Sequence, residues 1–153
     1  MEPSHNDELS GVTTAVVHAT VMIVDEDAWY ARVLHAYLEL RGWAPVVCSA
    51  REAMRDMREL RPRAVVLDFD APGIDAFELL HAMSSELAQT QVLVCSRFPE
   101  PLDPERSSLR ELGVTRWLRR PCSMEDIARA LDHDPSPSAA ASSDQAAQTQ
   151  LEA

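Results

Sequence analysis

The sequence predicts a doubly wound α/β fold, in which one sheet of five parallel strands carries helices on both faces. Five short apolar runs alternate with segments of helical periodicity, and most of these runs are apolar on both faces, which is typical of covered parallel strands. Strand order 2-1-3-4-5 with right-handed crossovers is the common solution for five such units. The expected strands are residues 20–24, 44–48, 64–67, 91–95 and 114–118.

Helix signals separate these strands. Gly42 closes the first helix, because glycine readily adopts the left-handed conformation that ends helices. Ser49 with Glu52, and likewise Ser123 with Asp126, has capping-box spacing at the start of the second and fifth helices. The first helix has one apolar face, formed by Tyr30, Val33, Leu34, Tyr37 and Leu38.

The third and fourth helices also have predicted ends. Asp75 is expected to cap the third helix, which starts near Phe77. Asp103 is expected to be the N-cap of the fourth helix, with Pro104 at the first helical position, where an amide N–H is not needed. Gly113 ends that helix. The five units together give the flavodoxin-like (βα)5 arrangement.

One domain is expected between two extensions. Residues 19–132 hold all five units, and this length suffices for one core but is thin for two. Residues 1–18 are predicted to be a flexible N-terminal extension. Residues 133–153 are rich in Pro, Ser, Ala and Gln with almost nothing to bury, and are predicted to be a disordered tail.

Composition narrows the classes of partner and the location. A formal net charge of −11 argues against nucleic acid and against an anionic membrane as partners, because both are polyanions. No stretch reaches the roughly 20 apolar residues of a membrane span, and the N-terminus does not resemble a signal peptide. Cys48, Cys95 and Cys122 lack metal-type spacing and are interpreted as free thiols of a reducing compartment. We therefore expect a cytoplasmic protein.

Acidic residues follow two of the predicted strands. Asp25, Glu26 and Asp27 come after the first strand, and Asp68 and Asp70 come after the third. In the expected strand order both loops open at the topological switch point, where doubly wound proteins bind ligands. Mg²⁺ prefers such hard oxygen ligands and relieves the repulsion among them. The alternative interpretation is a set of solvated acids that cap the turns.

Residues 19–132 resemble the receiver domain of two-component response regulators. The resemblance rests on the segments VMIVDED, LRPRAVVLDFDAPGIDAFELL, QVLVCS and WLRRP, which fall in order on the first, third, fourth and fifth strands. It implies a single-domain response regulator that accepts a phosphoryl group from a histidine kinase or phosphotransfer protein. A downstream protein would then bind the face formed by the fourth helix, fifth strand and fifth helix. Such a chain is a signalling protein and not an enzyme.

The resemblance also assigns the acidic residues. Asp68 would be the phosphoacceptor, because receivers carry a proline four residues after that aspartate, and Pro72 stands there. Asp25 and Glu26 match the metal-binding acidic pair. Asp70 would add its backbone carbonyl to a Mg²⁺ site that Asp68 completes. The side chain of Asp70 is interpreted as a solvated surface acid.

Three further residues match family positions at the ends of the last two strands. Ser96 matches the hydroxyl residue that hydrogen-bonds the phosphoryl group. Trp117 takes the place of the Tyr or Phe switch residue on the partner face, and is interpreted as packing on the fourth helix. Arg120 replaces the family's lysine. Because a guanidinium prefers planar two-point contacts, it is expected to clamp Asp68 directly or to pair with phosphate.

Arg97 is a second departure, at a position where receivers usually carry Ala or Gly. It either narrows access to the site or swings into solvent and pairs with Asp70 or Glu100. The chain contains 14 basic residues, all of them Arg, so the arginine at position 120 also reflects a chain-wide preference.

Two other hypotheses remain. A degenerate receiver would keep the fold and act as a phosphorylation-independent adaptor, which the two arginines, the tryptophan and the proline-rich segment RFPEPLDPE favour. A phosphatase of the haloacid-dehalogenase type would use the DFD motif at residues 68–70 as nucleophile and acid/base. That hypothesis is unfavourable, because Ala-Pro follows the motif in place of Thr or Val, and the remaining length leaves no room for a cap.

Overall fold

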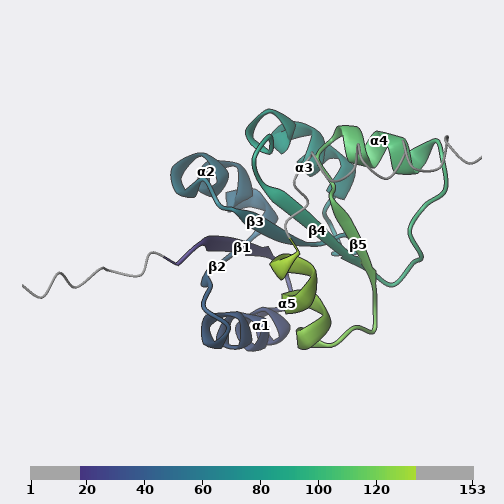
Figure 1. Cartoon of the computed structure of the whole chain (residues 1–153). Helices are drawn as coiled ribbons and strands as arrows, with labels where there is room; N and C mark the ends of the chain where they lie inside the picture. Colours follow the sequence, from purple (N-terminus) through teal and green to yellow (C-terminus); the bar gives the residue numbers. More distant parts are fainter. Residues whose placement is uncertain (1–17, 134–153) are drawn as a thin grey trace, which may run out of the picture.

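The computed structural model describes residues 18–133 and shows five parallel strands in one sheet, in the order β2-β1-β3-β4-β5 (Figure 1). The predicted fold class and strand order are confirmed. The 1–18 extension and the 133–153 tail lie outside the described residues, except for His18 and His133 themselves. The strands are β1 (Thr20–Val24), β2 (Ala44–Cys48), β3 (Ala64–Asp68), β4 (Gln91–Ser96) and β5 (Arg116–Arg119).

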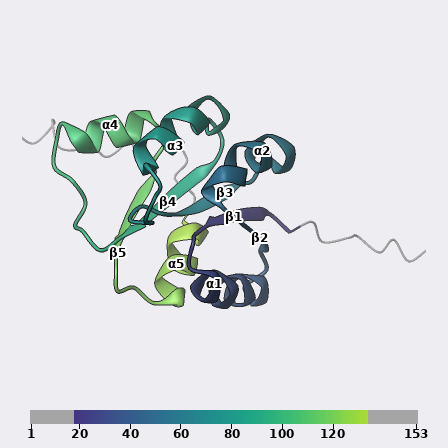
Figure 2. The same ribbon diagram turned by 180° about the vertical axis from the view of Figure 1, so that it is seen from behind.

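Five α-helices cover the two faces of the sheet, as the two opposite views show (Figures 1 and 2). On one face lie α1 (Ala28–Leu40) and α5 (Met124–Asp132). On the other lie α2 (Ala50–Leu60), α3 (Ala76–Met83) and α4 (Glu105–Glu111), with a short 3-10 turn at Ser84–Glu86 after α3. Within residues 18–133, none of the helices has the length and apolar character that a bilayer span requires.

Alternating residues of the central strands build two separate cores. Val21 and Ile23 of β1 pack toward α1 and α5, whereas Met22 and Val24 pack toward α2 and α3. All six residues of β4 are buried. A strand that is covered on both faces has no exposed side to make polar, which is why these runs are continuously apolar in the sequence.

The local capping signals form as predicted at five places. Ser49 and Ser123 each make a complete capping box, and Asp75 accepts a hydrogen bond from the amide of Glu78 at the start of α3. Gly42 and Gly113 follow α1 and α4 with φ of 90° and 105°, a conformation that L side chains adopt only with strain.

Other local predictions are wrong. Asp103 is not the N-cap of α4: the helix begins at Glu105, and the Asp103 carboxylate accepts the hydroxyl of Ser107 instead of an amide. Strand β5 begins at Arg116, two residues later than predicted, because the amide of Val114 still bonds to the end of α4. Val33 is 38% exposed, outside the apolar face of α1.

Candidate functional site

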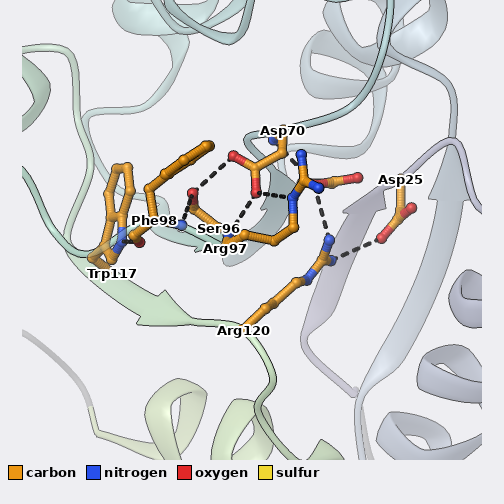
Figure 3. Close-up of polar contacts among 8 residues, drawn as sticks. Asp25, Asp70, Ser96, Arg97, Phe98, Trp117 and Arg120 are labelled. Atoms are coloured by element: carbon orange, nitrogen blue, oxygen red, sulfur yellow. Dashed lines mark hydrogen bonds and ion pairs between the residues drawn. The ribbon is translucent and has the colours of Figure 1, made fainter.

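The site lies at the carboxyl edge of the sheet, where three strands deliver charged side chains to one cavity (Figure 3). Asp25 follows β1, Asp68 is the last residue of β3, and Arg120 follows β5. Because β1 pairs with β3 in parallel, the two aspartates emerge side by side. The cavity has a volume of about 660 Å³ and is lined by Asp25, Asp27, Tyr30, Asp68, Arg97, Arg120, Pro121 and Cys122.

Arg120 bridges the two aspartates. Its Nη1 donates to Oδ1 of Asp68 at 3.0 Å, and its Nη2 donates to Oδ2 of Asp25 at 3.1 Å. The side chains are 22%, 11% and 4% exposed for Arg120, Asp68 and Asp25, so water screens these ion pairs only in part. The backbone amide of Arg120 donates to the carbonyl of Ser96 at 2.6 Å and fixes the start of this side chain. Of the two expected roles for Arg120, the structure shows the direct clamp on Asp68.

Tyr30 covers the guanidinium from the side of α1. The guanidinium carbon lies 4.9 Å from the centre of the Tyr30 ring, within the range of a cation–π contact. Neither the Tyr30 hydroxyl nor Nε of Arg120 has a hydrogen-bond partner among the described residues, and both atoms are buried. Burial raises the pKa of Tyr30 to about 12, so the ring stays neutral.

Burial dominates the electrostatics of Asp25. It raises the pKa of this carboxyl, and the nearby charge of Asp68 raises it further. The amide of Asp27, which donates to Asp25 at 2.8 Å, and the guanidinium of Arg120 both lower it. The net result is a raised pKa, so burial disfavours the ionised form of Asp25, and its hydrogen-bond and ion-pair partners partly offset that effect.

Asp68 keeps one oxygen available. Its Oδ1 accepts hydrogen bonds from Arg120 and from the amide of Asp70, the latter at 3.1 Å. No hydrogen bond reaches Oδ2 from any residue between 18 and 133. One oxygen of this carboxylate is therefore anchored while the other remains unpaired beside the cavity.

The side chain of Asp70 is not a solvated acid, contrary to the sequence-based expectation. It is only 9% exposed and accepts the hydroxyl of Ser96 at 2.8 Å and the amide of Arg97 at 2.6 Å (Figure 3). These bonds tie the loop after β3 to the end of β4. The Arg97 side chain swings outward, is 73% exposed and pairs with Asp70 at 3.7 Å, as one of its two interpretations predicts.

Two of the acids after β1 have local structural roles. Asp27 is the N-cap of α1, where its Oδ1 accepts the amide of Tyr30 at 3.0 Å. Glu26 is exposed and accepts the amide of Ala50 at the start of α2 at 3.2 Å. The acids therefore do not all converge as the sequence suggests. Across the described part of the chain, His, Cys, Asp and Glu side chains form no group of three or more placed to hold a metal ion.

Trp117 packs inward from β5. Its ring lies against the core cluster that contains Leu109 of α4, with the Phe69 ring centroid 5.1 Å away. Its Nε1 donates to the carbonyl of Phe98 at 3.0 Å, and the amide of Phe98 in turn donates to the hydroxyl of Ser96 at 3.1 Å. A continuous set of contacts thus links Ser96 at the site to Trp117.

Sequence reasoning missed two cavity residues. Tyr30 carried a usable signal, because it lies on the first helical turn, three residues beyond Asp27, which is both the cap and the last acid of the cluster. Cys122 follows Pro121 after β5, and its pKa falls to about 7 because the thiol of Cys95 interacts with it. Nothing in the spacing of the cysteines indicates that pairing.

A doubly wound sheet with acidic side chains and an arginine at its topological switch point can bind small charged ligands there. The chain belongs to the response regulator receiver domain family, whose model matches residues 21–132. A receiver domain is a signalling domain, and as a family such domains interact with histidine kinases or phosphotransfer proteins and bind Mg²⁺ in the acidic pocket.

Curated relatives are longer than this chain. It is 29% identical over 114 residues to protein-glutamate methylesterase/protein-glutamine glutaminase 5 of Myxococcus xanthus, covering 72% of this chain and 32% of the relative. It is 27% identical over 115 residues to the transcriptional regulatory protein PrrA of Mycobacterium leprae, covering 74% and 48%. The chain therefore spans about a third to a half of these relatives.

Solved structures share the fold. Chemotaxis protein CheY4 of Vibrio cholerae matches with a TM-score of 0.64 and 23% identity, over 76% of this chain and 98% of that one. A response regulator from Thermotoga maritima matches with a TM-score of 0.63 and 21% identity, over 76% and 96%.

Whether the pocket can bind Mg²⁺ depends on which carboxylate oxygens are already engaged. Asp25, Asp68 and the backbone carbonyl of Asp70 are the hard oxygen donors that this ion prefers. However, Arg120 already engages one oxygen of Asp25 and one oxygen of Asp68, and Glu26 bonds to the start of α2. The donor chemistry fits Mg²⁺, while the guanidinium takes the cation position between the two carboxylates.

Proposed function

We propose that Asp68 accepts a phosphoryl group from a histidine kinase or phosphotransfer protein in the cytoplasm, and that a protein partner reads the change through the α4–β5–α5 face. The observation that carries this proposal is that Asp68 has an unpaired carboxylate oxygen beside the cavity. It ends β3, lines the cavity, and has an Oδ2 to which no described residue donates. Such an oxygen is available as a nucleophile, and the charge of Arg120 lies beside it.

In the proposed step, the free carboxylate oxygen of Asp68 attacks the phosphorus of a phosphohistidine or of a small acyl phosphate. A new O–P bond forms as the bond from phosphorus to the donor nitrogen or oxygen breaks, and the donor leaves with that electron pair. The product is an acyl phosphate. Asp25, Asp68 and the carbonyl of Asp70 would hold Mg²⁺, which would neutralise phosphoryl charge when bound. Ser96 would then turn its hydroxyl from Asp70 to the phosphoryl group.

The test is the intact mass of the protein after incubation with acetyl phosphate and Mg²⁺. We expect one added phosphoryl group in the wild type and none in Asp68→Asn. Asp70→Asn is the matched control, because it removes the neighbouring carboxylate of the same motif and should keep the adduct. Hydroxylamine should release the group, since it cleaves acyl phosphates. An adduct that persists in Asp68→Asn refutes the assignment of Asp68.

A second candidate function is a phosphorylation-independent adaptor. It is favoured because two groups that phosphorylation would use are already bound within the protein. Arg120 pairs with Asp68, and the hydroxyl of Ser96 donates a hydrogen bond to Asp70. If the wild type gains no mass, beryllofluoride with Mg²⁺ should be added while tryptophan emission is followed, with Trp117→Phe to assign the signal. A folded protein silent in both assays is an adaptor. A phosphatase is less well supported, because Asp70, its acid/base candidate, is held by two hydrogen bonds.

A further inference from the structure

Arg120 has two contacts that the proposed phosphoryl transfer does not require: the ion pair with Asp25 and the cation–π contact with Tyr30. We propose that Arg120, positioned by Tyr30, is a built-in competitor of the divalent cation. In this arrangement Mg²⁺ enters the pocket only after the guanidinium withdraws from Asp25 and Asp68. The proposal concerns the unphosphorylated protein, and it stands or falls independently of phosphoryl transfer.

The first argument is that both cations need the same atoms. Arg120 donates to Oδ2 of Asp25 and to Oδ1 of Asp68 at 3.1 and 3.0 Å, so one planar group satisfies two carboxylates from different strands. Asp25 is 4% exposed, and its charge is costly without a cation. A guanidinium that already supplies this charge removes much of the attraction that the pocket would otherwise offer to Mg²⁺.

The second argument is that Tyr30 contacts the guanidinium in addition to the two carboxylates. The Tyr30 ring lies 4.9 Å from the guanidinium carbon and is fixed on the first turn of α1, whose N-cap is Asp27. A compact ammonium group would use neither the planar two-point contact nor the stacking as well. The chain-wide preference for arginine accounts for an arginine at this position, but it does not account for an aromatic ring packed over it.

The experiment is Mg²⁺ affinity measured by calorimetry on the full chain, with Mn²⁺ and its electron paramagnetic resonance signal as a second probe. We expect Arg120→Ala to bind the ion about tenfold more tightly than the wild type, because one competing unit charge has left the pocket. Arg119→Ala is the matched control: the neighbouring arginine is exposed, and its removal changes the net charge equally. It should leave the affinity within about twofold of the wild type. The Mg²⁺ affinity of Arg120→Lys should lie between those of the wild type and Arg120→Ala.

Tyr30 provides a test that leaves the charge of the pocket intact. Tyr30→Leu removes the ring and should tighten Mg²⁺ binding about two- to fivefold, the effect of one cation–π contact at a partly exposed site. Tyr30→Phe keeps the ring and removes only a hydroxyl that has no described partner, so its affinity should match the wild type. A urea unfolding curve for each variant shows that the binding comparison is made on folded protein.

The proposal is overturned if Arg120→Ala binds Mg²⁺ no more tightly than Arg119→Ala. It is also overturned if the tightened binding survives addition of Asp25→Asn, because the ion would then lie elsewhere. If Arg120→Ala does not fold, Arg120→Lys and the two Tyr30 variants decide the matter. Equal affinities for Tyr30→Leu and Tyr30→Phe would refute the positioning role of Tyr30.

Discussion

The ion pairs of Arg120 make a stability prediction that depends on pH. Arg120→Ala removes the cation that two largely buried carboxylates, Asp25 and Asp68, share. Removing one partner of a fully buried pair costs about 3–5 kcal/mol, whereas an exposed pair is worth about 0–1 kcal/mol. Because Arg120 is 22% exposed, we expect an intermediate loss of about 2 kcal/mol in the free energy of unfolding at neutral pH.

The loss should shrink in acid because of Asp25. The pKa of this carboxyl is raised in the folded protein, so the folded state binds a proton more readily than the unfolded state. Its charge therefore destabilises the fold above the folded pKa, and this cost disappears below the unfolded pKa of about 3.9. Without Arg120 the pKa of Asp25 rises further, so the variant should recover stability relative to the wild type as the pH falls through that window.

Urea unfolding followed by circular dichroism, at neutral pH and at pH ~4, measures both effects. Arg119→Ala is the control and should change stability by less than about 0.5 kcal/mol, because its side chain is exposed. A loss in Arg120→Ala that is equally large at both pH values would refute the electrostatic reasoning. A loss no larger than that of Arg119→Ala would refute the structural role of the clamp.

Three further predictions concern other parts of the fold. Interaction with Cys95 lowers the pKa of Cys122 to about 7, whereas burial raises the pKa of Cys48 to about 12. Iodoacetamide should therefore label Cys122 at a rate that rises through neutral pH and should leave Cys48 unlabelled, which peptide mass mapping would show. Ser49→Ala breaks the capping box of α2 and should cost about 1 kcal/mol in urea unfolding. Gly113→Ala places a methyl group 3.1 Å from a leucine side chain at φ of 105°, and should lower the melting temperature by more than Ser49→Ala does.

Features that depend on near neighbours in the sequence were predictable. The capping box joins Ser49 to Glu52, three positions later, and the burial of the middle of β4 follows from its apolar run at residues 92–95. The start of β5 was harder to predict. The amides of Gly113 and Val114 bond to the carbonyls of Arg110 and Leu109, which is a Schellman cap with the left-handed Gly113 at its centre. The glycine marks this cap in the sequence, but the cap also uses the amide of Val114, and this delays β5. The strand therefore starts where the helix releases the backbone.

In the candidate site, the positions of the residues were predictable but some of their side-chain contacts were not. Asp25, Asp68 and Arg120 reach one edge because each lies at the end of a parallel strand, and the order of the strands follows from the repeated units. The partners of Glu26 and Asp70 depend on side-chain rotamers, so their contacts with α2 and with Ser96 were not foreseen. Position in the sequence assigned these acids to the site, but it could not assign their hydrogen bonds.

The contacts around Ser96 indicate how the site and the proposed partner face would communicate. A serine hydroxyl has one proton to donate, so Ser96 cannot serve both Asp70 and a phosphoryl group. The same oxygen accepts the amide of Phe98, whose carbonyl in turn accepts Nε1 of Trp117. Because Trp117 already packs inward against Phe69, an inward swing of the ring is not available as the signal. We therefore expect the change at the partner face to arise from movement of the loop after β4, with Trp117 as its fixed point.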